Sequence, residues 1–325
     1  MNQLWGMSMI VNIAGTRAIS NMGSLDEGKL WSYGLGDPRP ELLYLSDAKW
    51  ISLIRGENDY FALIHQQEDK SLRVTAHSFA NIAEIISSIE LNIGDINAER
   101  PSEIAVSKII GRTSVWSSLP KTYIIRSLTE PYLVLVNWNQ QVGQIQPLPW
   151  YKESYDTMYQ GLLEATDIPG SPLVTISVQR DSQPVLYDPV KNQIVRKLKL
   201  GDRRGNPQLF FRKTKSELWA TDYDTLVRLN ARDWSVLNIL RLQEPKVGME
   251  RLFIGKYSFD FQESICAVAR PFEGDVVGIN PDTFAVTHRA VTGGQPQDVG
   301  LLSERHVVSR DWKTGQLMQG ILEKV

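Results

Sequence analysis

The sequence is almost without cysteine, and this absence limits the chemistry open to the chain. Its 325 residues include one cysteine, Cys266. A single thiol cannot form an internal disulfide, build a cysteine-based metal site or supply the paired cysteines of a haem attachment motif. Cys266 also lies inside an apolar run, where a thiol behaves as a small, inert hydrophobic group. We therefore expect Cys266 to form no intramolecular disulfide and to play no part as a catalytic nucleophile.

Charge of one sign and long hydrophobic runs are also missing. The formal net charge is −2, so no attraction of the whole molecule to nucleic acid is expected, and we predict no nucleic-acid partner. The apolar stretch 7–13 follows no Lys or Arg and is too short for a transmembrane helix. We therefore expect a strand there, a cytoplasmic location and no membrane partner.

A hairpin pattern recurs in the C-terminal half. Four Asp or Asn residues are each followed six positions later by an apolar residue, and these are Asp188, Asn230, Asn280 and Asp311. Asp and Asn cap turns by binding nearby backbone amides, and the apolar residue begins the next strand. The first intervals (188 to 230, then 230 to 280) are close to the roughly 40 to 50 residues of a four-stranded repeat unit. The last interval (280 to 311) is shorter and indicates an incomplete final unit.

Strand-forming runs and turn-forming segments alternate around these hairpins. The runs expected to be central strands are 132–136, 173–178, 217–221, 265–269 and 306–309. Segments rich in Gly and Pro, which break one sheet and start the next, are 36–40, 94–101, 201–207 and 293–296. The sequence thus predicts an all-β repeat protein in which residues 1–325 form a single domain.

Three segments resemble the YVTN-type repeats of seven-bladed β-propellers, which belong to a quinoprotein-like superfamily. They are Gly293–Gly300, Ser216–Asp222 and Gly274–Asp282, and the likeness extends over about residues 170–320. The resemblance implies a β-propeller of four-stranded antiparallel blades. Seven blades are favoured, with six as the alternative, because the linker segments taken alone suggest six units. The N-terminal strand, within 5–13, is expected to join the C-terminal blade and close the ring.

The linkers of such a propeller predict a ligand site. Connections from the outermost strand of one blade to the innermost strand of the next collect on one face around the central channel, which we call the channel-mouth face. Basic residues there could bind a carboxylate or phosphate. The candidates are Arg39, Arg100, Arg203, Arg204, Lys246 and Arg251, with Asp298 added on the same face. Acidic residues in the same linkers, such as Asp37 and Glu99, leave a neutral lattice of surface ion pairs as the alternative.

A second group of basic residues lies between positions 196 and 215. It consists of Arg196, Lys197, Lys199, Arg203, Arg204, Arg212, Lys213 and Lys215, against the single acid Asp202. One interpretation is an outer edge strand that charge protects from pairing with another sheet. The alternative is a binding surface for an anionic partner.

Local catalytic and cofactor motifs are not evident. Residues 23–29 have the spacing of a phosphate-binding loop, but Leu30 replaces the Ser or Thr that would hold magnesium, and Asp26 and Glu27 repel phosphate. The four histidines are not at metal-ligand spacing, and no nucleophile elbow of the Gly-x-Ser-x-Gly type occurs. We therefore predict no cofactor and no bound metal.

The function expected from these features is non-enzymatic binding of a small anionic ligand or a protein segment at the channel-mouth face. The alternative is a hydrolase resembling the lactonase propellers, in which carboxylates, an Arg and a His such as His65 or His306 come together from separate blades. Trp234 and Trp312 fall in predicted turns. They are candidates for partner contact or for packing against a neighbouring hairpin.

Overall fold

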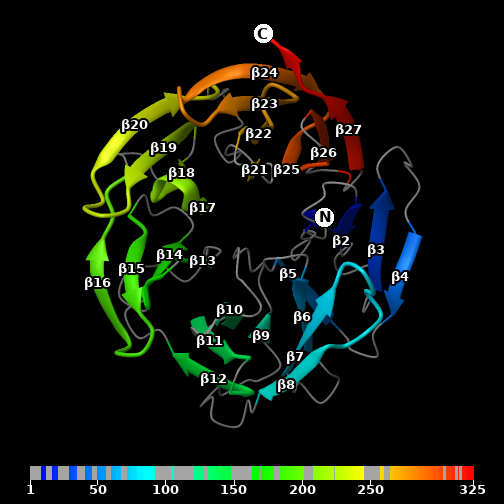
Figure 1. Cartoon of the computed structure of the whole chain (residues 1–325), viewed down its shortest axis with the longest axis vertical. Helices are drawn as coiled ribbons and strands as arrows, with labels where there is room; N and C mark the ends of the chain where they lie inside the picture. The colour runs from blue at the N-terminus through cyan, green and yellow to red at the C-terminus, as the bar shows by residue number, and fades with distance from the viewer. Residues whose placement is uncertain are drawn as a thin grey trace.

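The strands of the computed structural model form a ring of small antiparallel sheets (Figure 1). The structure describes residues 9–11, 17–20, 29–34, 41–45, 50–55, 60–66, 72–91, 104–105, 121–127, 131–138, 140–147, 163–168, 170–178, 183–200, 208–222, 224–244, 257–259, 264–302, 305–311, 314 and 317–325. Within these ranges the elements are strands and one short 3-10 turn, Lys213–Lys215. No helix in this part of the chain is long and apolar enough to cross a membrane.

Each of the first three sheets has four strands that follow one another in sequence. In the ring, the chain enters each sheet near the centre and leaves it at the rim (Figure 1). The strands are β1 (Met9–Val11), β2 (Arg17–Ser20), β3 (Lys29–Gly34) and β4 (Glu41–Leu45); β5 (Trp50–Arg55), β6 (Tyr60–Gln66), β7 (Leu72–Ser78) and β8 (Ser87–Leu91); and β9 (Ile104–Ala105), β10 (Lys121–Ser127), β11 (Pro131–Asn137) and β12 (Val142–Pro147).

The remaining described strands form four more sheets, so the described residues contain seven in all. The sixth sheet gains the chain's last strand, β28, at its outer edge, and the seventh has three described strands. The strands are β13 (Leu163–Asp167), β14 (Val174–Val178), β15 (Val185–Asp188) and β16 (Gln193–Lys197); β17 (Gln208–Arg212), β18 (Glu217–Asp222), β19 (Thr225–Asn230) and β20 (Val236–Arg241); β21 (Tyr257–Phe259), β22 (Cys266–Arg270), β23 (Asp275–Asn280), β24 (Ala285–Val291) and β28 (Glu323–Lys324); and β25 (Pro296–Leu301), β26 (His306–Asp311) and β27 (Leu317–Ile321).

The recurring Asp or Asn sets the register of the hairpin between the third and fourth strands of a sheet. The residue before it pairs with the apolar residue six positions after it, giving the pairs Tyr187–Ile194, Leu229–Val236 and Ile279–Val286. The side-chain oxygens of Asp188, Asn230 and Asn280 accept backbone N–H bonds from the turn, as the sequence predicted. In all three hairpins a bulge follows this pair, so the outer strands share one geometry.

The fourth residue after the Asp or Asn adopts a left-handed backbone conformation in each hairpin. The φ angles are 53° at Asn192, 64° at Trp234 and 54° at Phe284. Gln141 has the same conformation (φ 53°) four residues after Asn137. Large aromatic residues rarely adopt positive φ, so surrounding contacts must stabilise Trp234 and Phe284 in it.

Those contacts come from the neighbouring sheet. Phe284 is buried, and its ring meets the edge of Trp219 on β18 with centroids 4.9 Å apart. Trp234 packs into the cluster between the fourth and fifth sheets, which includes Leu186, Leu198 and Leu218. Of the two interpretations of Trp234, the structure therefore shows packing against a neighbouring element. Trp312 lies outside the described residues.

The match at Asp311 is not equivalent to the other three. Asp311 ends β26, the second strand of its sheet, so its turn connects the second and third strands and lies on the opposite face of the ring. This difference also explains why the interval from 280 to 311 is short. Asn280 ends the third strand of its sheet, whereas Asp311 ends the second strand of the next sheet, so the interval is one strand shorter than a full repeat. A side-chain cap stabilises either kind of turn, and for this reason the local pattern did not distinguish them.

The expected ring closure is not confirmed in the described part of the N-terminal segment. β1 pairs with β2 in the first sheet and not with the C-terminal sheet, and residues 1–8 lie outside the described residues. Strands of adjacent sheets instead meet through side chains, with Trp31 of β3 packed against Leu302 and Val308 of the last sheet. The C-terminal strand β28 pairs with β24 of the sixth sheet.

Replacing Phe284 with Ala should lower the free energy of unfolding by about 3 kcal/mol, because the truncation leaves a cavity between two sheets. Thr283→Ala, at the exposed neighbouring position, should change it by less than about 0.5 kcal/mol. Urea-induced unfolding followed by tryptophan fluorescence measures both. Equal effects from the two substitutions would contradict the role given to Phe284.

Candidate functional site

The cations predicted to surround the channel mouth occupy two kinds of position along the chain. Arg100, Arg203, Arg204, Lys246 and Arg251 fall between the last strand of one sheet and the first of the next, as expected of linkers. Arg39 falls between β3 and β4, two strands of one sheet, so the segment 36–40 is not a linker between sheets. All six residues lie outside the described residues, and their convergence stays a prediction.

Asp298 has a described backbone position. It is the third residue of β25, the first strand of the last sheet, and pairs in register with Arg310 on β26. A bulge lies between Pro296 and Asp298. This position is close to the linker that enters the sheet, and hence to the channel-mouth face.

A buried carboxylate organises the described part of the channel-mouth face in the sixth sheet. Asp275, fully buried at the start of β23, accepts hydrogen bonds from Nε (2.7 Å) and Nη2 of Arg270 and from Nε of Arg289. Arg270 also donates from Nη1 to the carbonyl of Leu242, in the linker from the previous sheet (2.9 Å). The carboxylate thus holds two strands and, through Arg270, the incoming linker.

A second ion-pair group lies on the same face of the fifth sheet. Buried Asp224 accepts a hydrogen bond from Nε of Arg241 (3.0 Å), and Arg241 Nη1 pairs with Glu244 at 3.1 Å. With the group around Asp275, three arginines face three carboxylates, so these charges cancel. The described charges on this part of the face are therefore balanced, and the cationic ring and the neutral lattice of the linkers both stay predictions.

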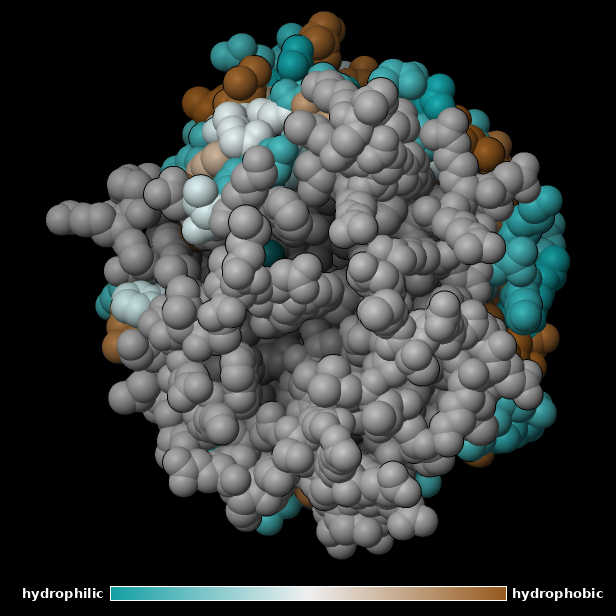
Figure 2. Space-filling view, turned by 180° about the vertical axis from the view of Figure 1, so that it is seen from behind, coloured by the Kyte–Doolittle hydropathy of each residue, from teal (hydrophilic) through white to brown (hydrophobic). Residues whose placement is uncertain are grey.

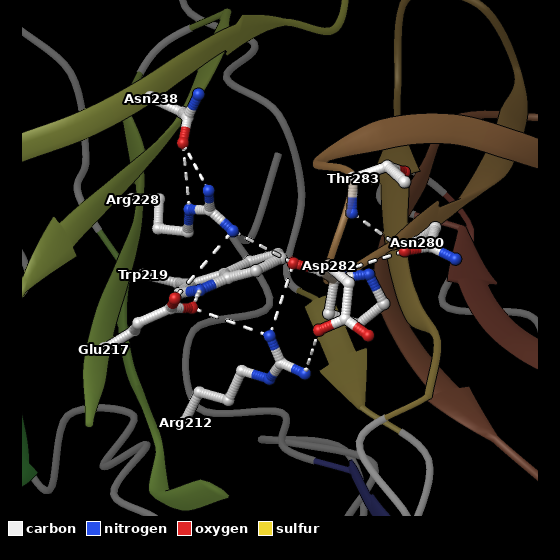
Figure 3. Close-up of polar contacts among 9 residues, drawn as sticks. Arg212, Glu217, Trp219, Arg228, Asn238, Asn280, Asp282 and Thr283 are labelled. Carbon is white, nitrogen blue, oxygen red and sulfur yellow. Dashed lines mark hydrogen bonds and ion pairs between the residues drawn. The ribbon is translucent and has the colours of Figure 1, made fainter. Parts of the chain in front are cut away.

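The opposite face carries a network that joins the fifth and sixth sheets (Figure 3). Arg212, buried at the end of β17, donates to the carbonyl of Pro281 (3.3 Å) and to Asp282 Oδ1 (3.0 Å). Its Nη1 also lies 3.6 Å from Glu217 Oε2, which accepts the indole N–H of Trp219 at 3.0 Å. The hydrogen bond from Arg212 holds the pKa of the Asp282 carboxyl below its usual value.

Arg228 extends this network to the outer strand. Its guanidinium donates to Asn238 on β20 and, at 3.1 Å, to the carbonyl of Pro281, and it lies 5.1 Å from the centre of the Phe284 ring. The hairpin tip 280–284 is thereby bound through its backbone, its acid and its aromatic ring. The geometry is that of a structural joint, and it leaves these arginines engaged within the protein.

The basic group between 196 and 215 divides in the structure. Arg212 is buried in the joint, whereas Arg196, Lys197 and Lys199 are exposed on or just after the outer strand β16. Arg203 and Arg204 lie outside the described residues, as does the side chain of Lys213, and Lys215 is exposed on the 3-10 turn. The interpretation as an outer edge strand therefore holds for residues 196 and 197.

Two of the four histidines form a buried hydrogen-bond chain. His77 Nδ1 donates to the carbonyl of Ile82 (2.9 Å), so the Nε2 of a neutral ring accepts from the Thr75 hydroxyl (2.7 Å). Thr75 Oγ1 in turn accepts from His65 Nε2 at 2.7 Å. All three side chains are completely buried, and burial lowers the pKa of His77 below its ordinary value of 6.5.

These positions do not suit the histidines proposed for the alternative hydrolase. His65 is inaccessible to a substrate because it is fully buried within the second sheet. His306 is exposed but begins β26, at the end of the sheet opposite to the channel-mouth face. In the described part of the chain, no group of three or more His, Cys, Asp or Glu side chains is placed to hold a metal ion.

The outer rim exposes apolar side chains next to charged ones (Figure 2). On β20 these include Leu237 and Ile239, the latter 58% exposed. Near β16 they are Val190 and Val195, 75% and 50% exposed. Each of these two strands is the last of its sheet, and among the described strands none pairs with its outer edge. The outer edges of these two strands therefore lack a described partner strand.

Comparison with solved structures identifies the fold. The β-propeller domain of Cps50 (Swd1) from Myceliophteria thermophila matches with a TM-score of 0.64, at 11% identity, over 99% of this chain and 98% of that chain. The chain folds as a β-propeller. The all-β propeller of antiparallel sheets is confirmed, whereas membership of the YVTN-type or quinoprotein-like group stays a prediction. No protein-family model matches the sequence. No curated protein matches it either.

Local sequence patterns did not predict the exposed rim or the joint, the network in which Arg212 and Arg228 bind the hairpin tip 280–284. Arg212 and Asp282 are 70 positions apart, so no motif connects them. The hairpin at Asn137 was missed because Gly143 stands six positions later, where the pattern required an apolar residue. The left-handed position itself gives no better sequence signal. In two of the hairpins it is occupied by Trp and Phe, which rarely adopt positive φ, so a search for Gly or Asn at that position would miss them.

Acidification should destabilise the protein through His77. Its folded-state pKa is below the unfolded value, so the unfolded chain binds more protons and the free energy of unfolding falls as pH decreases below 6.5. Above 6.5 this contribution should be constant. Each unit of pKa difference corresponds to about 1.4 kcal/mol.

Thermal melting between about pH 5 and pH 8 measures the effect. His77→Gln should reduce the slope on the acid side, and exposed His306→Gln should leave it unchanged. An acid slope that is the same in wild type and His77→Gln would show that His77 does not cause it.

Proposed function

We propose that this chain is a non-enzymatic protein-binding propeller, a rigid ring that holds segments of partner proteins on its surface. The observation that supports it best is the outer rim, where strands with free edges present apolar and cationic side chains to solvent. A free strand edge offers backbone N–H and C=O groups that an extended segment of another protein can pair with. The similar solved structure contributes the fold alone, given the low identity.

The polar groups inside the ring favour a scaffold over an enzyme. A general acid or base must reach its substrate. In three described clusters, the titratable side chains instead form hydrogen bonds with other groups of the protein. His65 and His77 are both hydrogen-bonded to the Thr75 hydroxyl, and Asp275 accepts hydrogen bonds from two arginines. Arg212 donates to Asp282 at the hairpin tip of the next sheet. These interactions fix strands and linkers in place, which is what a rigid platform requires.

The channel-mouth face is a second proposed surface. Five of the predicted cations fall in linkers between sheets, so they are candidates for contact with an acidic protein segment or a small anionic ligand. Between these two, the balanced charges around Asp275 and Asp224 favour the protein segment, because a small anion needs an uncompensated cation.

Thermal-shift measurements on the full chain distinguish binding of proteins from binding of small molecules. Phosphorylated sugars, lactones, dicarboxylates and divalent metals should each leave the melting temperature unchanged. A specific ligand present at about 100 times its Kd would add about 2.7 kcal/mol of stability and raise the melting temperature by several degrees. Selection from a peptide-display library should, in contrast, return peptides that bind the folded chain and not the heat-denatured chain.

Two results would contradict the proposal. One is a reproducible shift with a lactone or another small molecule together with turnover of that compound. The other is a library selection that returns no peptide specific for the folded chain.

A further inference from the structure

We propose that the open outer edge of β16 binds an acidic, extended segment of a partner protein, which adds to the fourth sheet as a fifth strand. This inference rests on the proposed function and specifies one surface and one chemical class of partner for it. The surface consists of β16 (Gln193–Lys197) with the flanking residues Val190, Lys191 and Lys199, and we call it the β16 edge.

The protein itself contains the geometry of such an added strand. In the sixth sheet, β28 pairs antiparallel with the outer strand β24, with His288 opposite Lys324 and Arg289 opposite Glu323. The backbone N–H of Val325 also donates to the carbonyl of Thr287 at 3.1 Å. An outer strand of this propeller can therefore accept a short extended segment along its rim edge.

The same pairing positions are present on β16. The hairpins at Asp188 and Asn280 share their register and their bulge, so residues can be matched by distance from the capping side chain. The bulged Thr287 corresponds to Val195, and the paired residues His288 and Arg289 correspond to Arg196 and Lys197. Along β16 no described strand occupies the position that β28 takes on β24.

The charge of the β16 edge selects an acidic segment. Opposite charges on directly facing residues stabilise a strand pair, and like charges destabilise it. Two adjacent cations, Arg196 and Lys197, stand at the matching positions of β16, with exposed Lys191 and Lys199 on either side. Arg196 also donates to the backbone carbonyl of Asp233 in the next sheet at 3.1 Å, a neutral acceptor that leaves its charge in place. The acid in this stretch, Asp188, is buried, caps its own turn and lies 3.6 Å from the ammonium of Lys191, so Arg196, Lys197 and Lys199 carry the net charge of the edge. An acidic strand therefore gains charge pairing there in addition to the backbone ladder.

The same cations exclude other strands. Lysine on an edge strand prevents pairing between like edges, because two copies of β16 would place cations opposite one another. The equivalent positions on β20 are Asn238 and Ile239, which carry no charge and do not discriminate by sign. Compared with β20, β16 thus has selectivity by charge at its pairing positions.

A peptide fits this edge better than a nucleic acid does. The edge of a strand presents alternating N–H and C=O groups, which an extended polypeptide matches along its length. Val190 and Val195 add exposed apolar contact area, which suits aliphatic side chains rather than phosphates. A nucleic acid would contact the cations of the β16 edge but would gain nothing from the backbone edge or from the two valines.

Fluorescence anisotropy with a defined probe tests the proposal. The probe is a labelled peptide of about seven residues, with valines around a central pair of adjacent glutamates, because the consecutive residues Arg196 and Lys197 face opposite sides of the sheet. It is compared with the counterpart that has lysines in place of the glutamates and with a single-stranded DNA oligonucleotide. The glutamate peptide should bind, and the double substitution Arg196→Glu with Lys197→Glu should weaken its binding at least about tenfold. N-methylation of the backbone along one edge of the peptide should abolish binding, because the ladder requires those N–H groups.

A charge-matched variant provides the control. Lys215→Glu with Arg305→Glu changes the net charge equally at two exposed positions away from β16, and should alter the affinity by less than about twofold. Hydrogen exchange should show protection of residues 193–197 on addition of the glutamate peptide. Melting temperatures of both double variants show whether each is folded.

The remaining outcomes overturn the proposal in distinguishable ways. If the peptide binds the β16 variant as well as wild type, or protects a different surface, the β16 edge is not the site, although the protein-binding function stands. If only the oligonucleotide binds and the same reversal abolishes it, the cations form a polyanion site. If no peptide of either charge binds and the library selection is also empty, both proposals fail.

Discussion

A sheet of three or four short strands has two apolar faces and cannot bury either by itself. In this ring each sheet depends on its neighbours, and the hairpin tip at residues 280–284 shows how the dependence is met. The backbone turns into a left-handed conformation at Phe284, and the ring then packs against Trp219 of the preceding sheet. Arg212 and Arg228 bind the carbonyl of Pro281 on the same tip. Stability and register are therefore set at the same contact.

This arrangement determines which groups remain for function. Central strands such as β15 and β23 are buried on both faces, and the arginines near them bind carbonyls and carboxylates that fix neighbouring elements. The outer strands β16 and β20 each have one described partner strand and are exposed along most of their length. A partner can thus engage the rim without disturbing the joints between sheets, which is the physical basis for assigning a binding function to it.

The sequence predicted those features that are local. A capping side chain and an apolar residue six positions later define a hairpin by themselves, and the pairs at Asp188, Asn230 and Asn280 follow that rule. The same rule did not distinguish Asp311, because a cap stabilises a turn on either face of the ring.

Contacts between sheets could not be predicted in this way, since the residues that meet are distant in sequence. Asp275 marks a strand start in the sequence, yet its three hydrogen bonds from Arg270 and Arg289 depend on strand pairing. The basic residues between 196 and 215 were one group in sequence, but folding places Arg212 in a joint and leaves Arg196 at the rim. A double-mutant cycle between Trp219 and Phe284, each replaced by Leu, tests the joint most directly, with unfolding free energies measured in urea. The account predicts a coupling energy of about 1 kcal/mol between the two rings. Additive effects would contradict it, because they would mean that the hairpin tip does not hold the adjacent sheet.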